Sequence, residues 1–415
     1  MFALHETTQR RVCRVTFIVL CVVPTLLTLV GIAYCNRPWR QADWQRTLAQ
    51  KFHVRAVLDN IKRPSPGVIE LTSLQLADLR TNNPLGSIDK LSFHRQNSRL
   101  TFHANHLTLK AGQLPALVTA VSTWLATGEL VPLDFHADRL TIMDSSLQTL
   151  ELSELSISSA TTDSQGQRFE LKALNDAGEQ IQLVLESEQG GLHFEADAQQ
   201  VPLPAWLVGK LVPGISGCGD ATFHGKISAT SDGQNTRGNL QGKFEQVDLQ
   251  TWIGNDGPHR LQGVAQLKLK QLDWTDDRIE TAQGSIKAGR GACSFSLLHN
   301  ARDISGCATG PTWETLSRES KDKLVPFGQL SLSFQLNSTG FAVAGLCKEG
   351  ALMTLEKAPL LFPPPQLRAV GEIVQLFDYR RQPGWLPATR RAHDMAEKLP
   401  LPGDEVGDPE KNSRR

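Results

Sequence analysis

Two histidines lie close together in the sequence HANH, which places His103 and His106 three residues apart. Imidazole nitrogens are common metal ligands, so this pair is the first candidate for a metal site. The surrounding residues alternate between apolar and polar types, which predicts a strand, and residues three apart on a strand point to opposite faces. We therefore expect the two side chains to be exposed or at the edge of the core, and not to share a metal ion.

Glycine-rich stretches are the next candidates, because such loops can hold a phosphate. The sequence GCGDATFHG (217–225) lacks the GxGxxG spacing, and a strand follows it where a dinucleotide site requires a helix N-terminus. The sequence GRG (289–291) is typical of a hairpin turn. No HExxH or GxSxG motif occurs, and the acidic residues are scattered over polar faces. The sequence thus predicts no catalytic residue, cofactor site or metal site.

Seven cysteines are present, and none forms a CxxC pair, which disfavours zinc ribbons and redox motifs. Three lie in or beside an N-terminal apolar run, and the other four are Cys218, Cys293, Cys307 and Cys347. Cys293 and Cys307 flank the sequence SFSLLHNARDISG, which we interpret as a hairpin. Either a cross-strand disulfide joins these two residues or both are buried thiols.

The charge balance argues against nucleic acid as a partner. Lys+Arg and Asp+Glu both number 43, and no basic stripe is visible along the chain. Hydrophobic residues make up 40% of the chain and charged residues 21%, as in ordinary folded proteins.

The residues from Val15 to Tyr34 form an uncharged run that is long enough to cross a bilayer as a helix. Pro24 in its middle is tolerated in transmembrane helices. We interpret the run as a membrane anchor whose short basic N-terminus stays in the cytoplasm. A cleaved signal peptide is the alternative, but no small-residue cleavage site closes the run. A lipoprotein cleavage box at residues 32–35 is disfavoured by the bulky Tyr34 before the cysteine.

Beyond this run the hydrophobic period identifies a few helices among many strands. Residues 39–52, 113–130 and 202–212 have helical spacing. Residues 67–79 alternate as a strand, with an irregularity near Ser73 that we interpret as a bulge. The alternation is most regular between residues 167 and 197, where turns rich in Gly and Asn or Asp predict hairpins. Their candidate inward apolar face consists of Phe169, Leu171, Ile181, Leu183, Leu185, Leu192 and Phe194.

The second half of the chain continues as strands joined by turns. We expect strands near residues 221–230, 238–249, 261–274, 278–289, 293–299 and 328–336, two further strands, and helices at 313–324 and near 370. Residues 379–415 are charged, rich in proline and aperiodic, which is typical of a disordered tail.

These elements predict a mostly β fold with one N-terminal transmembrane helix. About eighteen strands would form an elongated, curved, antiparallel sheet that leaves an apolar groove capped by a few short helices. We divide the chain into an anchor (1–36), an N-terminal β-rich region (37–200), a C-terminal β-repeat region (201–378) and the tail (379–415).

The chain resembles the AsmA-like envelope proteins in two stretches. After the anchor, Pro64, Pro66, Gly67, Leu74, Leu76 and Asp78 match the family's helix–strand–turn–strand segment. Later, Gly219, Gly225, Gly242, Asp248, Leu249 and Trp252 match its repeated glycine-spaced strands. The resemblance spans about residues 10–375.

This resemblance implies an inner-membrane protein with a cytoplasmic N-terminus and a periplasmic β-rich groove. It implies a role in moving phospholipid between membranes, with the membrane, phospholipid and other envelope proteins as partners. The first hypothesis is therefore a lipid-binding groove in envelope biogenesis. The second is an anchored scaffold with a closed core and protein or cell-wall partners. An enzyme is the third, and it would require paired acids or a histidine–acid pair in a cleft.

Overall fold

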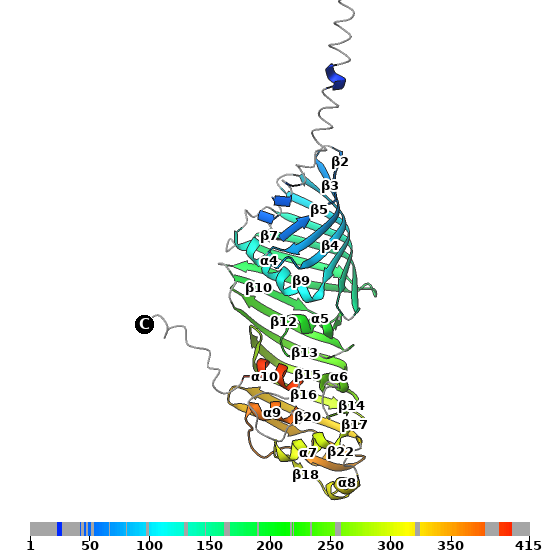
Figure 1. The fold of residues 1–415 in the computed structure, drawn as a ribbon, viewed down its shortest axis with the longest axis vertical. Coiled ribbons are helices and arrows are strands. Elements are labelled where there is room, and N and C mark those ends of the chain that lie inside the picture. The colour runs from blue at the N-terminus through cyan, green and yellow to red at the C-terminus, as the bar shows by residue number, and fades with distance from the viewer. Residues whose placement is uncertain are drawn as a thin grey trace, which may run out of the picture.

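A computed structural model of the chain shows a long stack of strands that runs almost the whole length of the molecule (Figure 1). The structure describes residues 23–26, 42, 45–46, 49–50, 54–65, 67–79, 81–96, 99–127, 132–145, 147–161, 167–188, 191–215, 218, 220–232, 235–253, 259–319, 324–377 and 390–400. Residues 23–26 and the described positions between 42 and 50 are helical, as expected there.

Within these ranges, no helix combines the length and apolar character needed to span a bilayer. The expected span from Val15 to Tyr34 lies outside the described residues, apart from residues 23–26.

The first part of the sheet is built from hairpins that follow one another along the chain. Its strands are β1 (Val54–Val57), β2 (Asn60–Ser65), β3 (Val68–Asp78), β4 (Pro84–Gln96), β5 (Arg99–Lys110), β6 (Leu133–Met143), β7 (Thr149–Thr161), β8 (Gln167–Leu174), β9 (Gln180–Glu188) and β10 (Gly191–Asp197).

The second part continues the same sheet with shorter and more interrupted strands. These are β11 (Leu203–Pro204), β12 (Thr222–Ser231), β13 (Thr236–Asp248), β15 (Val264–Thr275), β16 (Arg278–Ala288), β18 (Ala308–Thr309), β20 (Gln329–Asn337), β21 (Gly340–Gly345), β22 (Met353–Leu355) and β23 (Ala358–Phe362). Together the two parts make a 20-stranded sheet, and β14 (Leu261–Gln262), β17 (Gly291–Ser294) and β19 (Leu324–Phe327) form a separate 3-stranded sheet.

Neighbouring strands of the large sheet are antiparallel at almost every step, as the sequence predicts. The exception is the parallel pair β5–β6, which helix α4 (Leu114–Thr127) connects as a crossover. The fold is therefore mostly β, with a long, curved, antiparallel sheet and few short helices, and this part of the expected fold class is confirmed.

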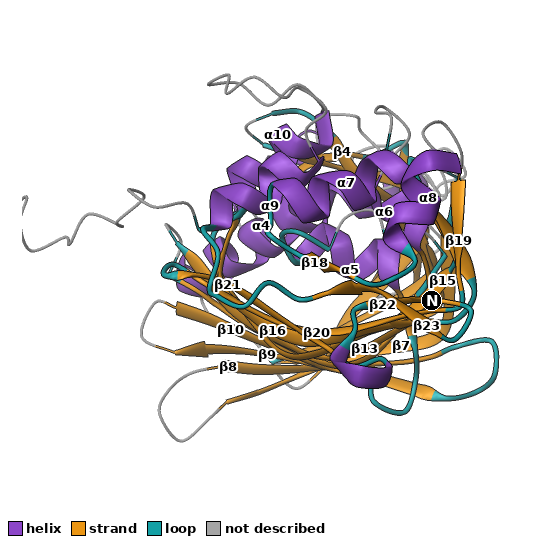
Figure 2. Cartoon of the chain, turned by 90° about the horizontal axis from the view of Figure 1, so that it is seen from below, coloured by secondary structure: helices purple, strands orange, loops and turns teal. Residues whose placement is uncertain are grey.

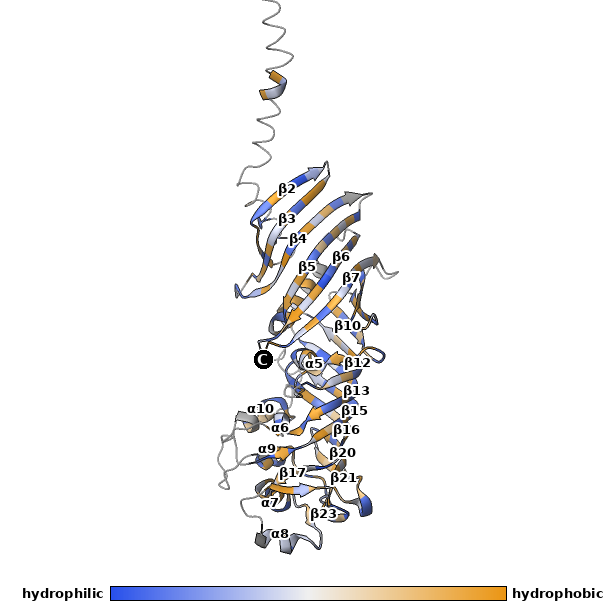
Figure 3. Cartoon of the chain, turned by 90° about the vertical axis from the view of Figure 1, so that its right-hand side faces the viewer, coloured by the Kyte–Doolittle hydropathy of each residue, from blue (hydrophilic) through white to orange (hydrophobic). Residues whose placement is uncertain are grey.

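The helices lie on one side of the curved sheet, inside its curve (Figure 2). They are α4, α5 (Ala205–Leu211), α6 (Leu249–Ile253), α7 (Phe295–Asp303), α9 (Val370–Phe377) and α10 (Arg390–Lys398), while α8 (Trp313–Glu319) lies at the far end of the stack (Figure 1). Apolar and polar residues alternate along the strands (Figure 3), and the buried apolar residues lie on the inner face, which the helices cover.

A crease crosses the first strands of the sheet. Successive inward residues are three apart there instead of two: Leu71 and Leu74 on β3, Ile88 and Leu91 on β4, Ala104 and Leu107 on β5, Ala137 and Leu140 on β6, and Leu152 and Leu155 on β7. The irregularity expected near Ser73 belongs to this crease, and Ser73 has a φ of 54°. Because all five strands carry the extra residue at the same level, the pairing register is kept across it.

Glycines in the second half face aromatic rings. Gly238 is paired with Trp274 and Gly284 with Phe334, and a Cβ on either glycine would overlap the ring opposite. Large rings can lie flat on a curved sheet only where the neighbouring strand has no side chain. Gly238 and Gly284 therefore serve close packing between strands.

Three expectations about the second half need correction. The sequence GRG (289–291) was expected to be a hairpin turn, but it joins β16 to β17, which do not pair and belong to different sheets. Residues 293–299 were expected to form a strand, but β17 ends at Ser294 and α7 begins at Phe295. The physical reason is an N-cap, because the Ser294 side chain accepts a hydrogen bond from the Leu297 amide. In the segment expected to be disordered, residues 390–398 form α10, whose Ala392 is fully buried.

Candidate functional site

The seven residues predicted to form an inward face do lie together on β8, β9 and β10. Phe169 is paired with Leu185, which is paired with Phe194, and Leu171 is paired with Leu183. Phe169 and Leu192 form a small buried cluster with Val118 and Val121 of α4. Ile181 is paired with Ala173 and is also buried. This face therefore lies on the helix side of the sheet.

The same face extends far beyond these three strands as one unbroken row of paired apolar residues, which we name the apolar track. Each member is the direct partner of the next on the adjacent strand. In order along the sheet they are Ile69, Phe93, Phe102, Phe135, Ile157, Leu171, Leu183, Ala196, Ile227, Leu240, Leu272, Ala282, Leu336 and Phe341. At about 4.8 Å between strands, the track is about 60 Å long.

Exposure divides the track into three parts. From Ile69 to Leu183 every member is half-buried. From Ala196 to Ala282 every member is at most 6% exposed. At the far end, Leu336 and Phe341 line a partly open cavity.

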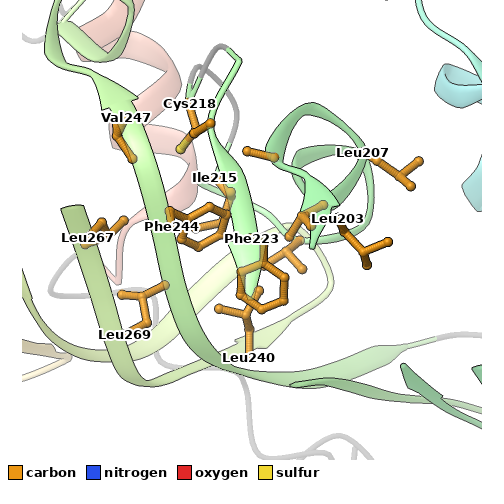
Figure 4. Close-up of a cluster of buried hydrophobic side chains, with 14 of the residues drawn as sticks. Leu203, Leu207, Ile215, Cys218, Phe223, Leu240, Phe244, Val247, Leu267 and Leu269 are labelled. Atoms are coloured by element: carbon orange, nitrogen blue, oxygen red, sulfur yellow. The ribbon is translucent and has the colours of Figure 1, made fainter. Parts of the chain in front are cut away.

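The middle part is sealed by side chains that pack over it (Figure 4). Phe223 and Phe244 are fully buried on neighbouring strands, with ring centroids 4.8 Å apart. Leu207 and Val208 of α5 are buried in the same core. In this part the sheet and its covering elements form a closed hydrophobic core.

The C-terminal cavity has a volume of about 400 Å³ and lies between the sheet and four helices. The sheet contributes residues of β16, β20, β21, β22 and β23, and the cover comes from α6, α7, α9 and α10. The lining consists almost entirely of aliphatic and aromatic side chains. Its few polar members are Ser305, Asp394 and Lys398.

Helix α10 forms part of the wall of this cavity. Ala392 and Leu399 are buried, and Met395 lines the cavity. The polar face of the helix carries an exposed ion pair between His393 and Glu397, with 3.2 Å between Nε2 and Oε1. Towards the cavity this segment presents Asp394, Met395, Lys398 and Leu399.

The histidine pair lies on the outer face of the sheet and not on opposite faces, so that expectation was wrong. The reason is the crease, because Ala104 and Leu107 both point inward and leave His103 and His106 outside. His103 Nε2 lies 3.2 Å from Asp138 Oδ1, and His106 Nδ1 lies 3.3 Å from Asp89 Oδ2. His106 Nε2 is also 2.9 Å from the Thr141 hydroxyl. Among the described residues, no group of three or more His, Cys, Asp or Glu side chains is arranged to hold a metal ion.

One acid with a perturbed pKa has a structural explanation. Burial acts to raise the pKa of Asp273, but hydrogen bonds donated by Thr281, Asn239 and Gln271 outweigh it and hold the pKa below its usual value. These partners lie on β13, β15 and β16. The carboxylate therefore ties three strands together and is already saturated with donors.

The proposed disulfide between Cys293 and Cys307 is absent, and the alternative of two buried thiols is confirmed. The four cysteines in the described part of the chain are all buried and none is bonded to another. Helix α7 separates the two, and Cys293 Sγ instead lies 3.9 Å from Met353 Sδ. Burial raises the pKa of Cys293 to about 12 and that of Cys307 to about 11, so neither is an activated nucleophile at neutral pH.

Sequence reasoning missed the cavity because it misjudged two of the covering helices. The sequence predicts a strand over the segment of α7 and a disordered tail over that of α10, whereas both form helices. A signal for α10 was present, since Ala392, Met395, Ala396 and Leu399 recur at helical spacing between charged residues.

No protein-family model matches the chain, and no curated protein sequence is significantly similar to it.

Proposed function

We propose that the chain is a membrane-anchored β-groove protein that binds or transfers lipid and contributes to the biogenesis of the outer membrane and envelope. The observation that carries the proposal is the apolar track, whose members from Ile69 to Leu183 remain half-buried over seven strands. A surface of this kind favours acyl chains, since each buried methylene contributes about 0.8 kcal/mol. The function requires area and no catalytic residue.

The proposed location follows from the N-terminal sequence. The run from Val15 to Tyr34 would anchor the chain in the inner membrane, with the N-terminus in the cytoplasm and the sheet in the periplasm. Phospholipid and the membrane are then the principal partners, with other envelope proteins as recipients or donors. The headgroup would stay in water at the rim of the sheet while the chains lie on the track.

A second function, an anchored scaffold with a closed core, is favoured by one specific observation. Between Ala196 and Ala282 the track is sealed and fully packed, as in an inert protein core. If the N-terminal half closes in the same way in solution, the sheet would serve only as a rigid spacer that binds protein or cell-wall partners.

The test is native mass spectrometry of a form that begins at Arg37 and retains α10, purified without detergent, with lipid extraction in parallel. Phospholipid at near-stoichiometric amounts is expected, and so is uptake from liposomes. A mass without lipid, together with no uptake, would contradict the proposal and favour the scaffold.

A matched pair of variants on β6 makes this test specific. Phe135 belongs to the track, whereas the adjacent His136 is exposed on the outer face. Phe135→Asp should lose the lipid, and His136→Asp should retain it. Equal lipid content in both variants would show that the lipid does not lie on the track.

A further inference from the structure

The C-terminal cavity is separated from the half-buried part of the track by the sealed middle. Five consecutive track members, from Ala196 to Ala282, are at most 6% exposed, and Phe223 and Phe244 are fully buried beside them. An acyl chain that lies on β3 to β9 therefore cannot continue into the cavity in this conformation.

We infer that the C-terminal cavity is a second binding site, distinct from the N-terminal part of the track, that takes a single alkyl chain. This second site goes beyond the proposed lipid binding on the track, because it is a different compartment that is covered by its own helices.

The lining determines the class of ligand. Deep in the cavity the walls are Leu, Ile, Val, Phe and Met side chains that offer no hydrogen-bond partner, as at Ile286, Leu332 and Met353. A ligand segment with donors or acceptors would leave them unpaired there, at a cost that apolar contacts would not offset. Only a hydrocarbon segment suits this part of the site.

The size of the cavity limits it to one chain. Its lining along β20 runs from Leu330 to Leu336, which spans about 20 Å at about 3.4 Å per residue. A volume of about 400 Å³ lies near the lower end of the range of about 300–1,000 Å³ that is typical of pockets for one small ligand.

The polar end of the ligand is placed by α10. Asp394 and Lys398 both line the cavity, and within the described part of the chain neither has an ion-pair partner. They contribute one negative and one positive charge, so the rim has no net preference for the sign of a headgroup. We therefore expect affinity to depend on chain length and only weakly on head charge.

The test uses the full chain in phosphatidylcholine vesicles and a photoactivatable fatty acid with a diazirine on its chain. After illumination, mass spectrometry should locate crosslinks on peptides that line the cavity, such as those containing Met353 or Leu376. Competition by unlabelled fatty acids should strengthen about fourfold per added methylene, from about 0.8 kcal/mol each, until the chain outgrows the cavity. The corresponding fatty alcohols should compete within a few-fold of the acids.

The variant Ala301→Trp tests the site directly, because Ala301 of α7 lines the cavity and an indole there would fill it. Crosslinking should fall at least tenfold while the melting temperature is kept or raised, since filling an apolar cavity stabilises a fold. Ala177→Trp is the matched control, because Ala177 is exposed in the β8–β9 turn. It should crosslink like the natural chain.

The outcomes separate this inference from the proposed function. Loss of the probe from Ala301→Trp with track lipid retained supports two compartments. Loss of both would show one continuous groove, which overturns the inference and leaves lipid binding intact. Crosslinks that are absent from the cavity, or competition that does not change with chain length, would overturn the inference whatever the track binds.

Discussion

From Ile69 to Leu183 the track is half-buried, whereas from Ala196 to Ala282 the same row of residues is sealed. The same row of paired residues runs through both regions, because each member is the direct partner of the next on the adjacent strand. The difference lies in how completely they are covered. Helix α4 packs on the N-terminal region through Val118 and Val121 but leaves the track there half-buried, whereas α5 and the Phe223–Phe244 pair complete the core of the middle region. The alternation of apolar and polar residues along the strands therefore produces an apolar face, and the elements that pack on this face decide whether it is core or surface.

A charged residue on the track should distinguish the two regions most strongly. Leu240→Lys in the sealed middle would bury an unpaired ammonium and should destabilise the fold by more than about 4 kcal/mol. Leu183→Lys in the half-buried region keeps its charge near water and should cost about 1–2 kcal/mol. Urea denaturation of both variants measures the difference.

The two lysine variants also test the proposed lipid binding. Leu183→Lys should lose co-purified phospholipid while it remains folded, and Leu183→Met should retain it as the size-matched control. Equal destabilisation by the two lysine variants would mean that the N-terminal region is also a closed core, which would favour the scaffold.

Much of the architecture could be predicted from the sequence because period-two alternation is a local signal. The hairpins of β8 to β10, the helices α4 and α5 and the antiparallel order all follow from residues close together in the chain. The crease could not be predicted in full, since it depends on five strands that carry an extra residue at one level. Only Ser73 showed it locally, and the faces of His103 and His106 were misjudged for that reason.

The candidate site was predictable on one wall only. The apolar face of the sheet was visible in Phe169 and its neighbours, but the cover of the cavity comes from segments remote in sequence. Helix α7 was obscured because Ser294 is both the last residue of β17 and the N-cap of the helix. The openness of an apolar face is a tertiary property that alternation does not encode.

Buried thiols offer a second way to compare the regions, because every cysteine in the described residues lies beyond residue 217. Burial raises the pKa of Cys293 from 9.0 to about 12, so between these values the unfolded chain loses its thiol proton while the folded chain keeps it. Stability should be independent of this group below pH 9 and should fall above it by about 1.4 kcal/mol per pH unit.

Denaturation curves across this pH range would measure how the free energy of unfolding changes with pH. Cys293→Ala is the control, because it removes the contribution of this thiol to that dependence. An identical slope in the natural chain and the variant would mean that the thiol is accessible to water. The C-terminal half would then be less tightly closed than its packing indicates.

The smallest effect is expected on the outer face of the sheet. Asp138 Oδ1 and His103 Nε2 lie 3.2 Å apart and their side chains are 63% and 50% exposed, so solvent screens most of the interaction. Asp138→Asn should change the free energy of unfolding by less than about 1 kcal/mol in urea and leave the lipid content unchanged.

Ala137→Asp is the matched contrast, because the adjacent Ala137 is only 2% exposed on the inner face. It should cost more than about 3 kcal/mol, because it buries a carboxylate without a partner. A loss of lipid in Asp138→Asn with stability preserved would instead assign part of the function to the outer face, which the comparison between the two inner regions would not explain.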